Sequence, residues 1–188
     1  MFSTYQSQDV TILLKDITGL VTPLGTRERE EKIQSGVHYS EMLPLEYEPS
    51  PAYLDGCRAL AEALVPALRR ELPAGGSLLV LGTEECMYPA LAAGAAAEAS
   101  GHWSAVRCHA TTRSPIGICH GADYPIQNGV LLPSFYGDGR RTYLYDLAAY
   151  DAAVVVTDAP QAAAAAALPR LAAALGQRGC PRLYLCEI

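Results

Sequence analysis

Residues 111–114, Thr-Thr-Arg-Ser, carry the clearest chemical signal in the sequence. Three hydroxyl groups beside a guanidinium suit an anion, because the hydroxyls are short hydrogen-bond donors and the guanidinium matches the geometry of a phosphate or carboxylate. Pro115 follows directly and stiffens this part of the chain. The segment predicts an anion-binding loop with Thr111, Thr112, Arg113 and Ser114 as ligand-binding residues. The alternative is an ordinary turn that carries a surface arginine.

A second polar stretch, residues 82–85, follows the apolar run 77–81. Here Gly82 and Thr83 are candidate ligand-binding residues. Glu84 or Glu85 could act as a general base, hold Mg²⁺ or accept a hydrogen bond from a ribose hydroxyl. The alternative is that the glycine permits a tight turn and the two acids complement the dipole of a following helix.

A third stretch, Thr157-Asp158, follows the apolar run 152–156. We expect Thr157 to contact the ligand and Asp158 to assist catalysis, although Asp158 could instead cap a helix. The loop 136–141, Tyr-Gly-Asp-Gly-Arg-Arg, could cover the site, and Arg140 or Arg141 could make a second contact with the anion. A solvated hairpin turn is the alternative for this loop.

Two further candidates are weaker. His38 lies close in sequence to Glu41 and offers a titratable imidazole for catalysis, or the segment around it packs on the sheet. Cys119 and His120 are adjacent, whereas the two partners of a catalytic cysteine–histidine pair normally come together in space. A cysteine hydrolase is therefore the weakest functional hypothesis.

These polar stretches need a scaffold that brings the ends of apolar strands together. Strand patterns alternate with helical patterns in residues 51–188. We expect strands at 77–81, 103–110, 152–157 and 182–186, and helices at 51–72, 86–100 and 158–176, the last interrupted at Pro169. A hairpin is expected within the insertion 111–143, with an arm at 143–147. Such alternation predicts an α/β fold with a small, open, mostly parallel, Rossmann-like sheet and flanking helices. Ligands of such sheets bind beyond the carboxyl ends of the strands.

Residues 1–50 differ from the rest and predict an irregular N-terminal arm joined to a domain formed by residues 51–188. Residues 9–14 form a short strand or an apolar docking segment, and Thr26 could cap a short helix that Gly36 ends. Prolines 44, 49 and 51 indicate an irregular connector. The arm has few apolar residues of its own, so we expect an oligomer or a heteromeric partner.

Composition narrows the range of functions. Lys and Arg total 14 against 20 Asp and Glu, for a net charge of −6, which argues against a nucleic-acid partner. Six scattered cysteines without a CxxC pair predict neither a disulfide scaffold nor a structural zinc site. The N-terminus does not have the pattern of a signal peptide, and the least charged stretch is a poor membrane span. We expect a cytoplasmic protein with reduced thiols and no metal centre of its own.

Several of these motifs occur together in one known family. They are residues 82–85, Met87-Tyr88-Pro89, residues 111–115 and Tyr143-Leu144-Tyr145-Asp146. Over residues 75–188 the sequence resembles the TRSP domain, which is named for its Thr-Arg-Ser-Pro motif. That family usually lies C-terminal to a phosphoribosyltransferase-like domain, in bacterial gene clusters of the tellurium-resistance type that are thought to make or modify a nucleoside-like metabolite.

The first fifty residues resemble a different family from the same gene clusters. Residues 9–15 and 34–43 are similar to the opening of StiP-family proteins, which are often labelled cysteine proteases. The Ala-Arg-Ala-Gly-Thr-Pro stretch and the acidic loop that follow in that family are missing here. In a phosphoribosyltransferase the acidic loop binds the 5-phosphate of phosphoribosyl pyrophosphate, so this chain does not resemble a self-sufficient phosphoribosyltransferase.

The resemblance and the residues together give two leading hypotheses. In the first, the chain binds a phosphorylated sugar or nucleotide-like ligand and takes part in glycosyl or phosphoribosyl transfer. In the second, it is a non-catalytic ligand-binding or accessory subunit that docks on a phosphoribosyltransferase-like partner. The sequence identifies no cofactor, and Mg²⁺ is the one that the acidic residues would suit.

Overall fold

A computed structural model describes residues 2–6, 11–16, 51–121 and 123–188. Its main feature is a six-stranded sheet with the order β1-β2-β8-β7-β3-β4. The strands are β1 (Phe2–Gln6), β2 (Thr11–Asp16), β3 (Ser77–Gly82), β4 (Ala105–Ala110), β7 (Ala152–Thr157) and β8 (Leu183–Glu187). The four strands from β8 to β4 are parallel to one another, which confirms the predicted α/β sheet.

The two central strands of the parallel part are apolar along their whole length. Every residue of β7 is buried, as are all residues of β3 after Ser77. Strands that are covered on both faces have continuous apolar residues, whereas strands with one exposed face alternate apolar and polar residues. At the edge, β4 alternates poorly and leaves Arg107 and Cys108 exposed.

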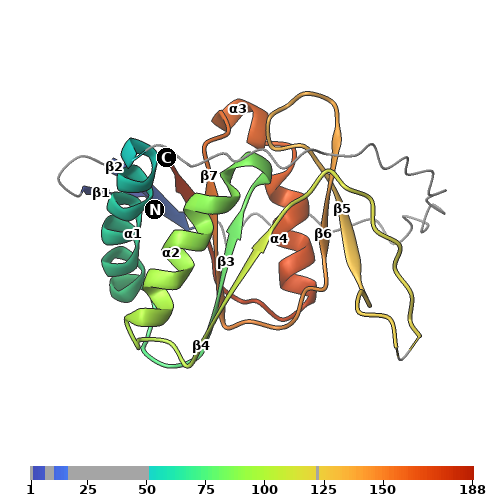
Figure 1. Ribbon diagram of the computed structural model, residues 1–188, viewed down its shortest axis with the longest axis horizontal. Helices are drawn as coiled ribbons and strands as arrows, with labels where there is room; N and C mark the ends of the chain where they lie inside the picture. Colours follow the sequence, from blue (N-terminus) through green and yellow to red (C-terminus); the bar gives the residue numbers. More distant parts are fainter. Residues whose placement is uncertain (1, 7–10, 17–50, 122) are drawn as a thin grey trace.

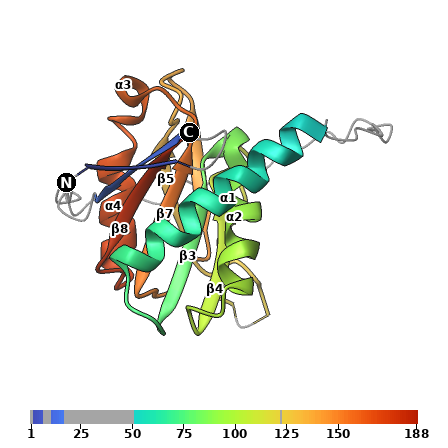
Figure 2. The same ribbon diagram turned by 90° about the vertical axis from the view of Figure 1, so that its left-hand side faces the viewer.

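Two helices cover one face of the sheet, as Figures 1 and 2 show. They are α1 (Pro51–Glu71) and α2 (Met87–Ala99), and the short 3-10 turn η1 (Glu84–Cys86) precedes α2. Leucines of α1 and alanines of α2 pack with Leu78, Val80, Val154 and Val156 in one core cluster. Because α2 presents mostly alanine and glycine to β3 and β4, its axis lies close to the sheet.

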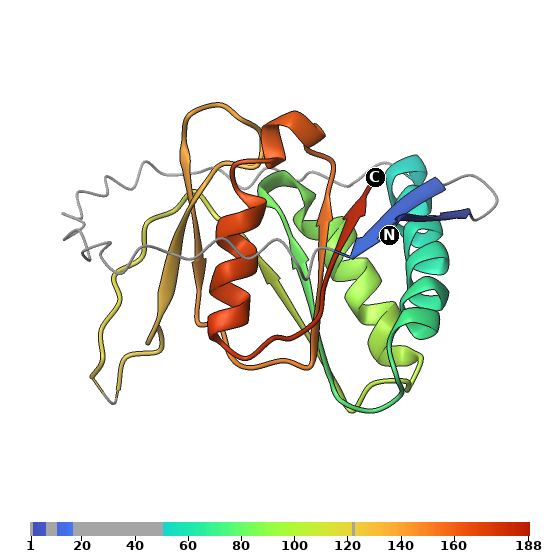
Figure 3. The same ribbon diagram turned by 180° about the vertical axis from the view of Figure 1, so that it is seen from behind.

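The opposite face carries α3 (Gln161–Ala164), α4 (Leu168–Gln177) and a separate antiparallel hairpin of β5 (Gly129–Pro133) and β6 (Arg141–Tyr145), visible in Figure 3. A second core cluster joins Leu132, Phe135 and Leu144 to α4 and to the sheet. The hairpin predicted within residues 111–143 is therefore confirmed. The expected interruption of the helix over 158–176 is present, because the segment is divided into α3 and α4. The break lies at residues 165–167, before Pro169, which is in the first turn of α4.

The strand order reverses at β3. From β3 the chain passes through α2 to β4 on one side, and then returns to β7 on the other side. In open α/β sheets the crevice beyond the carboxyl ends at such a reversal is the usual place for a ligand. The ends of β3 and β7 are therefore the relevant part of the fold.

Part of the N-terminal arm is more regular than predicted. Residues 11–16 form a strand that pairs antiparallel with β8, which agrees with the strand alternative predicted for residues 9–14. Residues 2–6 pair antiparallel with β2. The predicted helix after Thr26, the proline-rich connector and His38 lie outside the described residues. Within the described part of the chain, no helix combines the length and the apolar composition that crossing a membrane requires.

Candidate functional site

Two buried threonines join the ends of the central strands. Thr83, directly after β3, and Thr157, the last residue of β7, share a hydrogen bond of 2.7 Å between their hydroxyl oxygens. Thr157 Oγ1 also accepts the backbone N–H of Ala159 at 3.1 Å. Gly82 makes the turn after β3 possible, because a Cβ there would lie 2.6 Å from the carbonyl oxygen of Cys86. Both threonines thus fix the backbone that carries Glu84 and Asp158.

Glu84 connects three segments of the chain. Its backbone N–H donates to Thr111 Oγ1 at 2.9 Å, and its carboxylate accepts from Arg113 Nε at 2.8 Å and from the backbone N–H of Phe135 at 3.0 Å. The side chain is 1% exposed. Its φ of +43° is uncommon for a residue other than glycine. With both carboxylate oxygens in use, Glu84 holds the arginine in position.

Arg113 lies at the same edge of the sheet, and one side of its guanidinium is held by Glu84. While Nε bonds to Glu84, Nη2 lies 3.6 Å from Asp138 Oδ2 and the side chain remains 34% exposed. The hydrogen bond to Glu84 raises the pKa of the arginine further, so its charge is permanent. The remaining N–H groups of the guanidinium are the part that a ligand could reach.

Arg140 contacts the same carboxylate, Asp138. The backbone N–H of Arg140 donates to Asp138 Oδ1 at 3.0 Å, and its Nε donates to Oδ2 at 2.6 Å. These contacts, the backbone hydrogen bond foremost, lower the pKa of Asp138 to about 2. Asp138 is therefore ionised throughout the physiological range, and its Oδ2 lies within ion-pair distance of both Arg113 and Arg140.

The other residues of the predicted anion loop contribute mainly to its shape. Thr111 is buried and its hydroxyl accepts from Glu84, while the backbone of Thr112 pairs with Tyr143 of β6 in both directions, at 2.8 and 2.7 Å. Thr112 Oγ1 accepts the N–H of Ser114 at 3.2 Å. The Ser114 carbonyl accepts the hydroxyl of Tyr145 at 3.1 Å. The loop is thus anchored to the hairpin along its length.

Asp158 forms a separate pair with Tyr136, a residue to which the sequence analysis gave no role. The Tyr136 hydroxyl donates to Asp158 Oδ1, and it also lies within hydrogen-bonding reach of Thr83. Burial, together with the bond to Asp158, raises the pKa of Tyr136, so the phenol stays protonated. In sequence, the only signal for Tyr136 was its place in the glycine-rich loop 136–141.

Two comparisons with protein families bear on this arrangement. A model described as the TRSP domain C terminus to PRTase_2 matches residues 51–175, more than half of the chain. The chain belongs to the TRSP domain family. A second model, described as tellurite-like stress resistance cysteine protease StiP, matches residues 3–72. Searches of curated proteins and of solved structures gave no significant match.

Both resemblances seen in the sequence are confirmed, with different bounds: the TRSP match begins and ends earlier than 75–188, and the StiP match extends beyond residue 50. The TRSP match begins at the first residue of α1, and the StiP match continues to residue 72, so α1 belongs to both matched regions. The Thr-Arg-Ser-Pro motif that names the family is the segment bridged to β6. The predicted boundary at residue 50 remains a prediction.

Of the remaining predicted residues, Glu85 is exposed at this edge, and no hydrogen bond or ion pair joins it to another described residue. No cluster of three or more His, Cys, Asp or Glu side chains suitable for a metal ion occurs in the part of the TRSP domain that the structure covers. With Glu84 fully engaged, Glu85 and Asp158 are the carboxylates that could hold Mg²⁺ together with oxygens of a bound phosphate.

The cysteines give little support to hydrolase chemistry. Cys119 and His120 are both exposed in the loop before β5, where Cys119 Sγ accepts the N–H of Gly121 at 3.4 Å. In the region that matches StiP, the sequence contains one cysteine, Cys57. Burial raises the pKa of the Cys57 thiol, and a hydrogen bond with Tyr53 offsets part of that effect. A nucleophilic cysteine needs the opposite shift.

Proposed function

We propose that this TRSP domain binds a phosphorylated sugar or nucleotide-like ligand at the carboxyl edge of its parallel sheet, and that it takes part in glycosyl or phosphoribosyl transfer in the biosynthesis of a nucleoside-like metabolite. The family description supports this role, because it associates the domain with PRTase_2. That association supports the proposed reaction type, and the geometry of the edge supports the proposed binding site.

The observation that carries the proposal is the way in which Arg113 is held. A buried carboxylate, Glu84, fixes one side of the guanidinium and leaves the other side accessible. An arginine held in advance loses little side-chain entropy when it binds a phosphate. Arg140, whose side chain is 59% exposed, supplies further donors next to Asp138. A phosphate between the two arginines would receive charge-assisted hydrogen bonds from both.

The charges of the cluster limit the affinity. Glu84 and Asp138 balance Arg113 and Arg140, so an incoming phosphate must displace part of the contact with Asp138. The separation of 3.6 Å between Arg113 Nη2 and Asp138 Oδ2 is too long for a good hydrogen bond, so displacing this contact costs little binding free energy. Glu85 and Asp158 are then the carboxylates that could exchange a proton with the ligand.

A second candidate is a non-catalytic ligand-binding subunit for a phosphoribosyltransferase-like partner. The involvement of Glu84 in structural contacts favours it, because the best-positioned acid at the edge has no free oxygen for catalysis. In this case the chain alone would bind the ligand without turning it over.

The test uses the purified full chain with inorganic phosphate, ribose 5-phosphate and phosphoribosyl pyrophosphate. Calorimetry measures binding, and release of pyrophosphate measures turnover. We expect Arg113→Gln to weaken binding of all three compounds by about tenfold or more, the value of a charge-assisted hydrogen bond. The matched control is Arg178→Gln, at an exposed position after α4.

Each outcome separates the alternatives. Release of pyrophosphate by the chain alone, with water as the acceptor of the sugar, identifies an enzyme, and binding without release supports a binding subunit. Equal affinity of wild type and Arg113→Gln would show that the anion site does not lie at this arginine.

A further inference from the structure

Asp158 occupies the position that a ligand of this fold would meet first. It follows β7 directly, at the reversal of strand order between β3 and β7, and its side chain is exposed. The backbone on either side is fixed, because Thr157 bonds to both Thr83 and the N–H of Ala159. The carboxylate is therefore presented from a rigid strand end.

The carboxylate of Asp158 keeps unused hydrogen-bonding capacity. The Tyr136 hydroxyl donates to Oδ1, and no other hydrogen bond to this carboxylate is found among the described residues. An ionised carboxylate accepts about four hydrogen bonds, so most of that capacity, including all of Oδ2, faces solvent. Tyr136 orients the carboxylate of Asp158 but uses only part of its hydrogen-bonding capacity. Groups that donate hydrogen bonds, such as sugar hydroxyls, suit the remaining acceptor positions.

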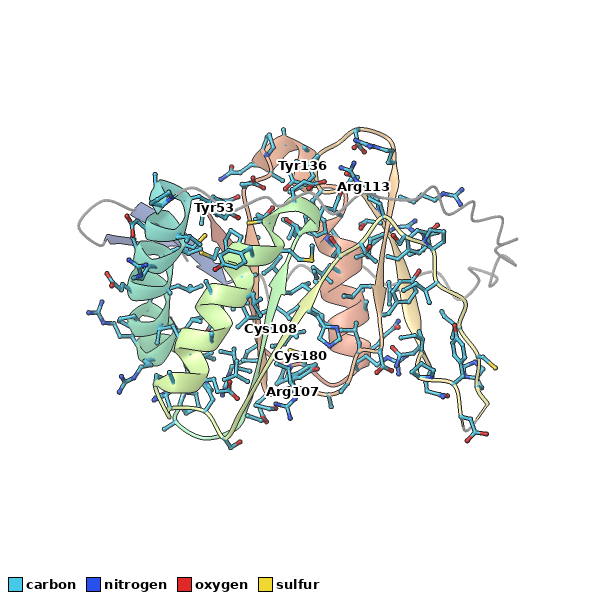
Figure 4. The ribbon with its side chains drawn as sticks, in the orientation of Figure 1. Tyr53, Arg107, Cys108, Arg113, Tyr136 and Cys180 are labelled. Carbon is cyan, nitrogen blue, oxygen red and sulfur yellow. The ribbon has the colours of Figure 1, made fainter. Side chains whose placement is uncertain are left out.

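One loop links this carboxylate to the proposed anion site. Tyr136 and Asp138 are two residues apart in a loop closed by the hydrogen bond from Ser134 N–H to the carbonyl of Arg140, at 2.9 Å. Glu84 holds the same loop through the N–H of Phe135. Glu84 thus joins Arg113 to the residue that precedes Tyr136, and Figure 4 shows both labelled residues toward the upper edge of the view.

We propose that Asp158, oriented by Tyr136, binds the vicinal hydroxyls of a sugar whose phosphate is held by Arg113 and Arg140. The inference rests on the proposed function and narrows its ligand to a pentose phosphate, or a nucleotide, with a free diol. Two adjacent hydroxyls donate to the two oxygens of one carboxylate. A sugar that lacks one of them leaves an acceptor oxygen without its partner, which is how polar sites reject deoxy analogues.

The experiment compares ribose 5-phosphate with 2-deoxyribose 5-phosphate, and uses inorganic phosphate as the probe of the anion site alone. We expect the wild-type chain to bind the ribose compound about tenfold or more tightly than the deoxy compound. In Asp158→Ala the two compounds should bind within about twofold of each other, while the affinity for inorganic phosphate is retained. Tyr136→Phe should give an intermediate preference, since it removes only the orienting hydroxyl.

Asp55→Asn, at an exposed position on α1, is the matched control and should keep the full preference. Equal binding of both sugars by the wild type, or an unchanged preference in Asp158→Ala, would overturn this inference and leave the anion site standing. If none of the three phosphates binds the wild type, the proposed function fails and the inference fails with it. Circular dichroism and thermal unfolding show that each variant is folded before its affinities are compared.

Discussion

At Glu84, backbone and side chain are both committed to neighbouring segments. The sequence suggested a general base or a ligand for Mg²⁺, but the carboxylate bonds to Arg113 and to the N–H of Phe135. The conformation with positive φ places the side chain inward, which an acid in an ordinary first helical turn would not do. A positioning role for Glu84 makes the exposed side of Arg113 the part of the pair that meets a ligand.

Thr111 tests this arrangement at the level of a single residue. Its buried hydroxyl is the acceptor for the N–H of Glu84, so Thr111→Val leaves that donor unpaired at nearly constant side-chain volume. We expect the free energy of unfolding to fall by about 1–3 kcal/mol in a urea titration. Thr111→Ser keeps an acceptor and should retain most of the stability. Equal unfolding midpoints for the valine and serine variants would contradict the role of this hydroxyl.

At the scale of elements, close contact between α2 and the sheet depends on small residues. A Cβ on Gly94 would lie 2.2 Å from Cys108 Sγ of β4, far inside van der Waals contact. The same approach occurs at Gly82, where the chain leaves β3 for η1. Short side chains on α2 therefore set the distance between the helix and the strands that carry the edge residues.

Gly94→Ala tests this packing, because the sign of the change in unfolding free energy shows whether α2 lies close to β4. In an exposed helix this change stabilises by about 1 kcal/mol, but here we expect a loss of about 1–3 kcal/mol from overpacking. The double variant Gly94→Ala/Cys108→Ala removes the sulfur and should recover most of that loss. Thermal unfolding of the single and double variants measures the coupling between the two positions. A stabilised single variant would show that α2 does not lie so close to β4.

At the scale of the whole molecule, most of the thiols are buried, and the two core clusters on opposite faces of the sheet contain three of the six. Cys57, Cys86, Cys180 and Cys186 are buried, while Cys108 and Cys119 are exposed. Burial raises the pKa of Cys86 to about 12 and that of Cys180 to about 11. Buried thiols of this kind react only when the structure opens.

Thiol labelling therefore reports on global unfolding. With a disulfide reagent at pH 8 we expect rapid modification of Cys119, slower modification of Cys108, whose pKa is raised by partial burial, and no reaction of the four buried thiols until the protein unfolds in urea. Mass spectrometry of peptides locates the label. Cys119→Ala should remove the fast phase and leave phosphate binding unchanged. Rapid labelling of Cys186 in the native protein would contradict the closed core.

The N-terminal strands show the limit of local pattern. The sequence of residues 9–14 was compatible with a strand or a docking segment. Residues 11–16 form a strand because the edge of β8 is available for pairing. Residues 2–6 gave no strand signal, because pairing with β2 depends on a partner and not on their own sequence. The structure of such edge strands therefore depends on the neighbouring strand with which they form hydrogen bonds.

The sequence by itself determined the alternation of strands and helices, the parallel sheet and the three polar stretches at strand ends, because apolar periodicity and turn residues are local properties of the chain. Tertiary structure alone decided the partners: that Glu84 would hold Arg113, that Asp138 would pair with two arginines, and that Tyr136 would reach Asp158. These contacts join residues 22 to 29 positions apart in the chain, as well as neighbours in one loop. Such pairing depends on where the folded backbone places each side chain, and no local pattern encodes that.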